Sequence, residues 1–551
     1  MKLPRMRDLT DAQRDVYLYA PNDTHVLVAG PPGTGKTLIA CFRAVELQER
    51  GVPVVLCMFS RVLAKFASTG GDGHETPLAV VTVRTWFQKW WHTSGLPPRS
   101  TGTDILLNVL YHDRVAAREA GALWRPNVWN PWQARYGTWV APLGTWTETR
   151  DRLSAWPASQ EPPLRADAPD EYDWDAICLH LVQHAFTMND AAVSPGTLLI
   201  DEGQDFPPGF YQFLYMLSAI GSSRSAPHPL RCMVLADENQ QLKEFNSTLS
   251  EIQSSLKIAD SQRYQLLDNF RNTREIAELA RQFFADVGVM PRLPARGGEI
   301  PAFLECGSMS ACVKTIMTWV TNHPGKETGI LVFKENKREL LQASLEVEAA
   351  KLPGRALRVQ SYSWDSRARN KVDELVFDEK DVITVLNMQS CKGLEFDAVF
   401  IVDLHDATIG SMGADRFRMQ MFVAVSRARQ WVELLESLAV RETDAFLKEL
   451  PDERYLKRRH FLPAPNVARM QMADAAAVAD SVVSAHPARG AGAVSESWRT
   501  SVMLLATRYG WKFEDTRPKG CFWLYAPEDA KAQLEKLGFQ YSGRRNGWWR
   551  R

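Results

Sequence analysis

A glycine-rich segment near the amino end limits the possible folds more than any other part of the chain. The apolar run Val26–Ala29 precedes the sequence GPPGTGKT at residues 30–37, and a stretch with helical spacing of apolar residues follows. The pattern G-x-x-x-x-G-K-[ST] between a strand and a helix is typical of a phosphate-binding loop. Gly33 and Gly35 permit the backbone conformations that turn several N–H groups inward. The segment therefore predicts a phosphate site that opens onto the start of a helix.

Individual residues of this loop have predicted roles in binding a nucleoside triphosphate. Lys36 should reach the β- and γ-phosphates, and the hydroxyl of Thr37 should hold Mg²⁺. The helix that begins near Lys36 adds its positive amino end to the site. The residues predicted to surround the phosphates are Gly30, Pro31, Pro32, Gly33, Thr34, Gly35, Lys36 and Thr37.

A second part of a nucleotide site follows the apolar run Thr197–Ile200. The sequence there continues as DEGQD, residues 201–205. Asp201 would hold Mg²⁺ through water, and Glu202 would accept the proton of an attacking water molecule. An acidic turn is the alternative interpretation, which the phosphate-binding loop disfavours.

Three further side chains are candidates for contacts with the nucleotide. Gln13 carries a donor and an acceptor that suit the edge of adenine, although a surface glutamine is an equal alternative. In ADENQQ, residues 236–241, Gln240 or Gln241 could sense the γ-phosphate and orient water. Arg271, in LDNFRNT, is a candidate arginine finger.

Polar and aromatic residues follow two other strand-like runs, Val52–Phe59 and Ala79–Val83. Strands that alternate with helices predict a parallel sheet covered on both faces, with ligands at the carboxyl ends of the strands. The residues predicted to face a nucleic-acid strand are Ser60, Arg61, Thr85 and Trp86. A place in the core is the alternative, and it is favoured for Trp90 and Trp91.

The alternation stops at residues 92–190, which are rich in Trp, Pro and Gly. This segment predicts an inserted subdomain that is helical in part, at Ile105–Ala120 and Trp174–Thr187. Its aromatic residues predict a small core, and one or two of them could stack on bases. After it, strand-like runs such as Val382–Leu386 and Ala398–Val402 indicate a second α/β domain.

Two different segments complete the chain. Residues 463–495 are rich in Ala, Val, Pro and Gly, which predicts a linker. Residues 496–551 carry more Lys and Arg than Asp and Glu, with aromatic residues between them. That composition suits binding of a single strand or a duplex end, and a structural or protein-docking module is an equal alternative.

Composition narrows the class of protein. The formal net charge of zero excludes a global basic field, so any nucleic-acid contact must come from local patches. Eight scattered cysteines without a C-x-x-C pair predict reduced thiols rather than disulfides or structural zinc. The chain shows neither a secretory signal nor an apolar run long enough to span a membrane, so we expect a cytoplasmic protein.

The order and spacing of these motifs resemble superfamily 1 DNA helicases of the UvrD/Rep type. The likeness spans Leu9–Leu435 and includes the blocks LTDAQ, GPPGTGKT, CMFSR, TVRTWF, DEGQD, ADENQQ, LDNFRNT, SCKGLEFDAVFI and VAVSRAR. It implies two RecA-like parallel-sheet domains, an α/β fold, with ATP and Mg²⁺ in the cleft between them. The inserted Trp-rich subdomain and the small α+β C-terminal module are additions to that pair.

The resemblance also implies roles for single residues. Gln13 would read adenine and Glu395 would contact the ribose. Gln240 would couple the γ-phosphate to motion, while Arg271 and Arg427 would reach ATP from the second domain's side of the cleft. The expected catalytic residues are therefore Lys36, Asp201, Glu202, Gln240, Arg271 and Arg427.

The implied activity is that of an ATP-dependent helicase or translocase, an ATP hydrolase that moves 3′→5′ on single-stranded DNA or a tailed duplex. The alternative is a DNA-sensing regulatory ATPase subunit of a repair or anti-phage nuclease complex. Only residues 337–381 separate GILVFKEN from VITVL, so the duplex-engaging subdomain that the family inserts there, called 2B, is reduced or missing. The expected division is 1–91 and 191–275 for the first RecA-like domain (1A), 92–190 for a 1B-like insertion, 276–462 for the second RecA-like domain (2A), 463–495 for the linker and 496–551 for the C-terminal module.

Overall fold

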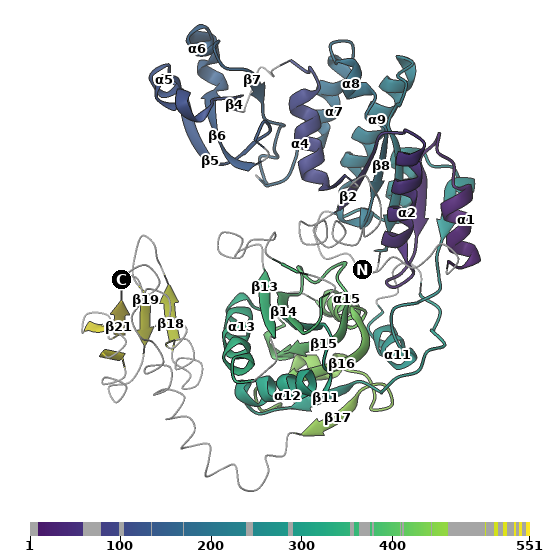
Figure 1. Cartoon of the computed structure of the whole chain (residues 1–551), viewed down its shortest axis with the longest axis vertical. Helices are drawn as coiled ribbons and strands as arrows, with labels where there is room; N and C mark the ends of the chain where they lie inside the picture. The colour runs from purple at the N-terminus through teal and green to yellow at the C-terminus, as the bar shows by residue number, and fades with distance from the viewer. Residues whose placement is uncertain are drawn as a thin grey trace.

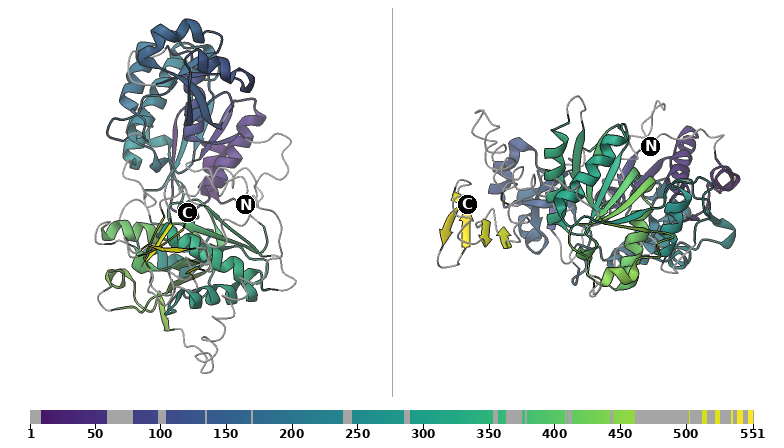
Figure 2. Two further views of the ribbon diagram at one scale, coloured as in Figure 1. Left: turned by 90° about the vertical axis from the view of Figure 1, so that its left-hand side faces the viewer. Right: turned by 90° about the horizontal axis from the view of Figure 1, so that it is seen from below.

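The computed structural model describes most of the chain up to residue 460 and short segments beyond it. The residues described are 9–460 except 59–78, 98–103, 134, 169, 239–245, 285–289, 353–356, 363–374, 377–378, 408, 410–412 and 442–443, and then 502, 512–515, 522–525, 534–535, 539–542 and 547–550. Figures 1 and 2 show two α/β lobes, each built around its own sheet. No helix within these ranges combines the length and apolarity needed to cross a membrane.

The first sheet has six strands in the order β10-β1-β9-β8-β2-β3, and every recorded pairing in it is parallel. Its strands are β1 (Val26–Ala29), β2 (Val54–Met58), β3 (Val80–Thr82), β8 (Thr197–Ile200), β9 (Arg231–Ala236) and β10 (Arg263–Gln265). Alternate residues of β1 enter different cores: Val26 and Val28 pack on one face, and Leu27 and Ala29 on the other. The sheet is therefore covered on both faces, as its continuous apolar strands predict.

Helices on the two faces of this sheet complete the first lobe. They are α1 (Asp11–Tyr19), α2 (Lys36–Glu49), α4 (Val83–Thr93), α7 (Trp174–Gln183), α8 (Asp190–Val193), α9 (Pro208–Ser223) and α10 (Leu249–Leu256). Because the strands are parallel, the carboxyl ends of β1, β2 and β3 lie at one edge of the sheet, where α2 and α4 begin.

The inserted segment forms a separate antiparallel sheet in the order β5-β6-β4-β7. Its elements are β4 (Asp104–Leu107), α5 (Arg114–Glu119), β5 (Leu123–Asn130), β6 (Arg135–Pro142), α6 (Trp146–Leu153) and β7 (Ala158–Gln160). The prediction of a helix over Ile105–Ala120 is therefore wrong in its first part. Ile105, Leu106 and Leu107 are buried between two partner strands, and a short apolar run cannot distinguish a strand from a helix.

The second large sheet has seven strands in the order β13-β14-β12-β15-β16-β11-β17, again with every recorded pairing parallel. Its strands are β11 (Ala302–Glu305), β12 (Thr328–Val332), β13 (Arg358–Tyr362), β14 (Val382–Asn387), β15 (Phe396–Val402), β16 (Ala428–Glu436) and β17 (Lys457–His460). The main helices are α11 (Arg274–Gln282), α12 (Met309–Asn322), α13 (Glu335–Ala349) and α15 (Ala414–Val425). The predicted fold class, two RecA-like parallel-sheet domains, is confirmed.

The C-terminal module contains a small antiparallel sheet. Its strands are β18 (Lys512–Asp515), β19 (Phe522–Tyr525), β20 (Gln540–Ser542) and β21 (Gly547–Arg550), in the order β18-β19-β21-β20. Phe522, Leu524 and Trp548 are buried together in its core. Trp523 and Trp549 pair across the strands with ring centroids 6.4 Å apart.

Candidate active site

The phosphate-binding loop lies between β1 and α2 and is closely packed. Gly33 and Gly35 have φ angles of 79° and 84°, which favour glycine. A Cβ atom at Gly33 would lie 2.6 Å from Oδ1 of Asn269, and one at Gly35 would lie 2.5 Å from Nε2 of Gln13. Larger residues would collide with these polar atoms, so both positions need glycine for space as well as for conformation.

The ammonium group of Lys36 lies over this loop. Its Nζ donates to the carbonyl oxygens of Gly30 at 2.6 Å and Pro31 at 3.1 Å, and the residue is only 7% exposed. A buried cation held at the mouth of a glycine-rich loop is suited to binding phosphate oxygens.

Thr37 and Asp201 meet at the first turn of α2. The Thr37 hydroxyl donates to Oδ2 of Asp201 at 2.6 Å, and Asp201 directly follows β8. Burial and the neighbouring charge of Glu202 raise the pKa of Asp201 to about 6. A hydroxyl and a carboxylate are oxygen ligands of the kind that Mg²⁺ prefers, so this pair could hold the ion.

Glu202 lies beside this pair in a strained conformation. Its φ angle is 54°, in the left-handed region that non-glycine residues rarely adopt, and such strain is concentrated at functional sites. Its Oε2 accepts a hydrogen bond of 2.7 Å from Nε2 of Gln204 and lies 3.8 Å from Nζ of Lys392. Burial would raise the pKa of Glu202, but the positive charges of Lys392, Lys36 and Arg427 outweigh it and lower that pKa. Glu202 is therefore a carboxylate at neutral pH.

The predicted arginines lie on different sides of the cavity, so the expectation that both come from the second domain is wrong for Arg271. Arg271 follows β10 of the first sheet and lies beside Gly33, whereas Arg427 lies between α15 and β16 of the second domain. Nη2 of Arg271 lies 2.5 Å from Oε1 of Glu395, and its Nη1 donates to the carbonyl oxygen of Ser426 at 3.2 Å. Nη2 of Arg429 lies 3.2 Å from the other oxygen of Glu395. Burial would raise the pKa of Glu395, but Arg271 and Arg429 hold it at about 2. Arg427, 1% exposed, donates from Nε to the carbonyl oxygen of Val423 at 2.9 Å.

These groups share one cavity of about 560 Å³ between the two large sheets. The sequence-predicted residues that line it are Pro32, Gly33, Gly35, Lys36, Thr37, Glu202, Arg271, Glu395 and Arg427. Asp201 is connected to it through Thr37. Residues from both sheets thus face one space large enough for a nucleotide.

Gln13, predicted to read adenine, is outside the set of residues that line this cavity. It is 4% exposed; its Oε1 accepts from the N–H of Thr10 at 3.1 Å, and its Nε2 donates to the carbonyl oxygen of Thr34 at 2.9 Å. The side chain therefore supports the phosphate-binding loop from α1, the helix it helps to cap.

The residues predicted to face a nucleic-acid strand lie in different environments. Ser60 and Arg61 are outside the described residues, as is Gln240, the residue predicted to sense the γ-phosphate. Thr85 is half-buried in the first turn of α4, where its N–H donates to Oγ1 of Thr82 at 3.1 Å. For Trp86 the prediction of a strand contact is wrong. Its side chain is buried in the core of the first domain and stacks on Trp90, with ring centroids 6.4 Å apart. The pair is four residues apart on α4, so both rings lie on its inward face.

Two residues of this site were missed from the sequence. Phe270 lines the cavity and is 52% exposed, an unusual state for a phenylalanine. Lys392 crosses between the domains: its Nζ lies 2.7 and 2.6 Å from the two carboxylate oxygens of Asp205, and both residues are buried. Both residues stand in blocks quoted above, beside Arg271 and Glu395, but neither burial nor pairing can be read from a motif.

The Lys392–Asp205 pair leads to a stability prediction. Lys392→Ala removes this cation from the buried carboxylates of Asp205 and Glu202, which is expected to destabilise the protein by about 3–5 kcal/mol. Lys351→Ala is a matched control, because Lys351 is 51% exposed and its ion pair among the described residues is a surface one, with Glu348. That variant should lose less than about 1 kcal/mol. Denaturant unfolding followed by fluorescence checks both, and equal midpoints for the two variants would contradict the prediction.

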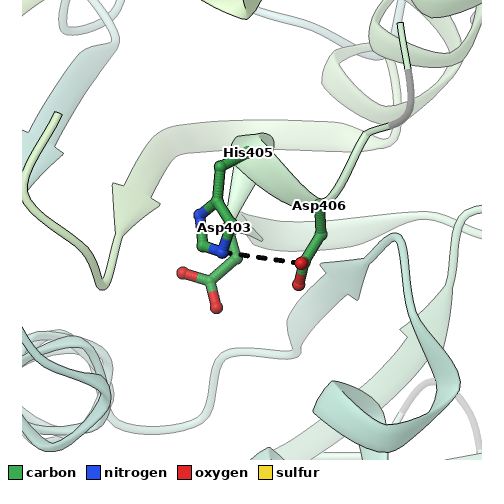
Figure 3. Close-up of side chains that lie close together, drawn as sticks. All are labelled: Asp403, His405 and Asp406. Carbon is green, nitrogen blue, oxygen red and sulfur yellow. Dashed lines mark ion pairs between the residues drawn. The ribbon is translucent and has the colours of Figure 1, made fainter. Parts of the chain in front are cut away.

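A second group of possible metal ligands lies at the end of β15 (Figure 3). Ligand atoms of Asp403, His405 and Asp406 lie within 4.8 Å of one another. However, Nζ of Lys337 lies 2.5 Å from Asp403, and Nζ of Lys334 lies 2.7 Å from Asp406. These lysines already neutralise the carboxylates, so the group forms an ion-pair network that joins this turn to the first turn of α13.

Comparison with known proteins supports the class that the fold and the cavity define. Residues 382–435 match the UvrD-like helicase C-terminal domain, a segment that runs from β14 to β16 and contains Lys392, Glu395 and Arg427. Together with the two parallel-sheet domains, this match supports a UvrD-type superfamily 1 helicase.

Two solved structures show low overall similarity to this chain. One is the C-terminal domain of a possible DNA helicase from Lactobacillus plantarum WCFS1, with 16% identity over 34% of this chain and 98% of that one, and a TM-score of 0.25. Another is Mss116p bound to ssRNA and AMP-PNP, with 12% identity over 90% of this chain and 81% of that one, and a TM-score of 0.41. No curated protein matches the sequence significantly.

Proposed function

We propose that this protein is an ATP-dependent translocase or helicase that moves 3′→5′ on single-stranded DNA. The observation that carries the proposal is the shared cavity: Lys36 and Glu202 face it from the first domain, and Arg427 faces it from the second. Groups that bind, hydrolyse and sense a triphosphate are thus divided between two bodies. The division of the chain given above, with 276–462 as the second motor domain, belongs to the same proposal, except that α7, expected in the inserted subdomain, packs in the core of the first domain.

The residues present fit ATP with Mg²⁺. The positive φ angles at Gly33 and Gly35 are typical of a phosphate-binding loop, and the hydroxyl of Thr37 already contacts the carboxylate of Asp201. Phe270 and Leu38 line the same cavity and offer an apolar surface to a base. Mg²⁺, when bound, would neutralise part of the charge on the phosphate oxygens.

The protein's own groups then account for hydrolysis. Glu202 is ionised at neutral pH because of the nearby cations, so it can accept a proton from water in front of the γ-phosphate. Arg427 and Arg271 would stabilise the charge that develops there. Arg271 must first exchange its ion pair with Glu395 for the phosphate, which links nucleotide binding to a rearrangement at the domain boundary.

Such a cleft can convert hydrolysis into motion. Both walls contact the same triphosphate when the cleft is closed, and they lose that common partner after cleavage, so the balance between closed and open states shifts. If the two domains grip a strand alternately, each cycle advances the protein along it. Contacts with strand phosphates would make binding depend on salt concentration.

The second candidate is a DNA-sensing regulatory ATPase subunit of a repair or anti-phage nuclease complex. One observation favours it. The described part of residues 337–381 consists mainly of α13 and β13, which belong to the second large domain. The described part of the span in which related helicases insert a duplex-engaging subdomain thus belongs to the motor domain itself.

A panel of nucleic acids tests the proposal. ATP turnover should rise several-fold with single-stranded DNA and less with duplex DNA or with RNA of equal length. Strand displacement from a 3′-tailed duplex, but not a 5′-tailed one, would establish a helicase with the expected polarity. Stimulated turnover without displacement by the protein alone would favour the regulatory subunit, and turnover indifferent to every nucleic acid would overturn both.

A further inference from the structure

A second cavity, of about 460 Å³, lies between α4 of the first domain and the small antiparallel sheet. It shares no lining residue with the nucleotide cavity. The side chains that matter below are Arg84 and Gln88 from α4, Trp129 and Tyr136 from β5 and β6, and Glu161 and Tyr172 from the segment after β7.

The walls of this cavity are joined firmly. Nε1 of Trp91 donates to the carbonyl oxygen of Gln160 at 2.8 Å, and Nδ1 of His92 lies 2.8 Å from Oγ of Ser159. Both contacts tie α4 to β7, and Figure 1 shows α4 standing between the small sheet and the first large sheet. These two contacts hold α4 against β7 close to the cavity.

Three aromatic side chains, Trp129, Tyr136 and Tyr172, line the cavity. Trp129 and Tyr136 pack edge to face, with ring centroids 5.4 Å apart, and Tyr136 is 39% exposed. The guanidinium carbon of Arg84 lies 5.5 Å from the ring centroid of Tyr172. Flat rings and a guanidinium are the groups on which nucleobases stack.

Polar groups face the same space. Gln88 is 5% exposed, and its amide offers a donor and an acceptor. Burial raises the pKa of Glu161 to about 8, against the opposing charge of Arg84, so at neutral pH it is a carboxylic acid that can both donate and accept. Arg84 is the one cationic side chain among the residues that line the cavity in the described chain, beside the acidic groups of Asp104 and Glu161. This composition suits an uncharged polar ring better than a phosphate.

The position of the cavity in the fold also suits contact with a bound strand. Arg84 stands in the first turn of α4, directly after the carboxyl end of β3. Because β1, β2 and β3 run in the same direction, this is the sheet edge at which the phosphate-binding loop lies. A strand that follows this edge would pass the cavity.

We propose that this cavity holds one nucleobase of the bound single strand, stacked against Tyr136 and Trp129 and hydrogen-bonded at its edge by Gln88 and Glu161. The inference rests on the proposed function, because it assumes that a single strand binds to this protein. It adds a site that contacts a base of that strand, in addition to contacts with the backbone. Binding should therefore depend on the presence and identity of bases.

The test compares a base-bearing oligonucleotide with an abasic oligonucleotide of equal length, with dissociation constants measured by fluorescence anisotropy. Wild-type protein should bind the base-bearing strand about 5- to 100-fold more tightly, the range that base–aromatic stacking supplies. Tyr136→Ala should remove most of that ratio. Gln88→Met keeps the side-chain length without the amide, and it should change the order of affinity among the four homopolymers.

Tyr111→Ala is the matched control, because Tyr111 belongs to the same inserted unit, is 79% exposed and lies outside the cavity. Its ratio of dissociation constants for the abasic and base-bearing strands should equal that of wild type. If Tyr136→Ala kept the wild-type ratio, or lost affinity equally for both strands, the inference would be overturned. Failure of the proposed function is distinguishable, because it would appear as wild-type ATP turnover that no single strand stimulates.

Discussion

Lys36→Ala is expected to lower ATP turnover by about 10²–10³-fold or more, with the fold intact. Lys36 is the cation that lies over the loop, and its ammonium is the group placed to stabilise charge on the transferred phosphate. In its place alanine leaves the glycine conformations of the loop unchanged. The measurement is steady-state ATP hydrolysis with and without single-stranded DNA, alongside circular dichroism and a thermal unfolding curve.

Lys314→Ala controls for the loss of a lysine, because Lys314 is exposed on α12, away from the cavity. It should retain wild-type turnover. The assignment of the phosphate site would be refuted if Lys36→Ala hydrolysed ATP at a wild-type rate and responded to DNA.

Arg271→Ala should reduce the maximal turnover rate by roughly 10³–10⁵-fold, the contribution expected of an arginine finger, and change nucleotide affinity far less. Here Arg271 pairs with Glu395 and with the carbonyl oxygen of Ser426. Its guanidinium lines the cavity and can exchange the carboxylate for a phosphate. Pre-steady-state binding of a fluorescent ATP analogue separates affinity from turnover.

Arg292→Ala is the control for this second prediction, because Arg292 is 67% exposed and pairs with Asp268 close to the same block. It should change turnover by less than about threefold, since exposed pairs contribute little. If Arg271→Ala lost only a few-fold in rate while weakening nucleotide binding strongly, Arg271 would be a binding residue rather than a catalytic one.

Short motifs predict part of this site reliably because their requirements are local. The glycines at 33 and 35 need unusual backbone angles, and Lys36 and Thr37 follow at the first turn of a helix. The carboxylates Asp201 and Glu202 come directly after a buried strand. Each of these features depends on residues adjacent in the chain, so a linear pattern contains it.

Other elements have a burial or a secondary structure that local sequence patterns do not predict. Trp86 follows the polar residues Arg84 and Thr85 in sequence, but its side chain is buried in the core because the inward face of α4 packs against α7 and α9. The apolar run at residues 105–107 forms a strand only because β6 and β7 lie on either side of it. In both cases the deciding partner comes from a distant part of the chain.

The amino-acid sequence by itself determined two parallel α/β domains, the phosphate-binding loop and the acidic pair after β8, because apolar periodicity and glycine spacing act over a few residues. Only the tertiary structure decided that Lys392 meets Asp205 across 187 positions and that Arg271 meets Glu395 across 124. It also decided that α4 and the small sheet enclose a cavity. Such contacts follow from how two sheets and an inserted unit pack together, and packing between distant segments leaves no fixed spacing in the chain.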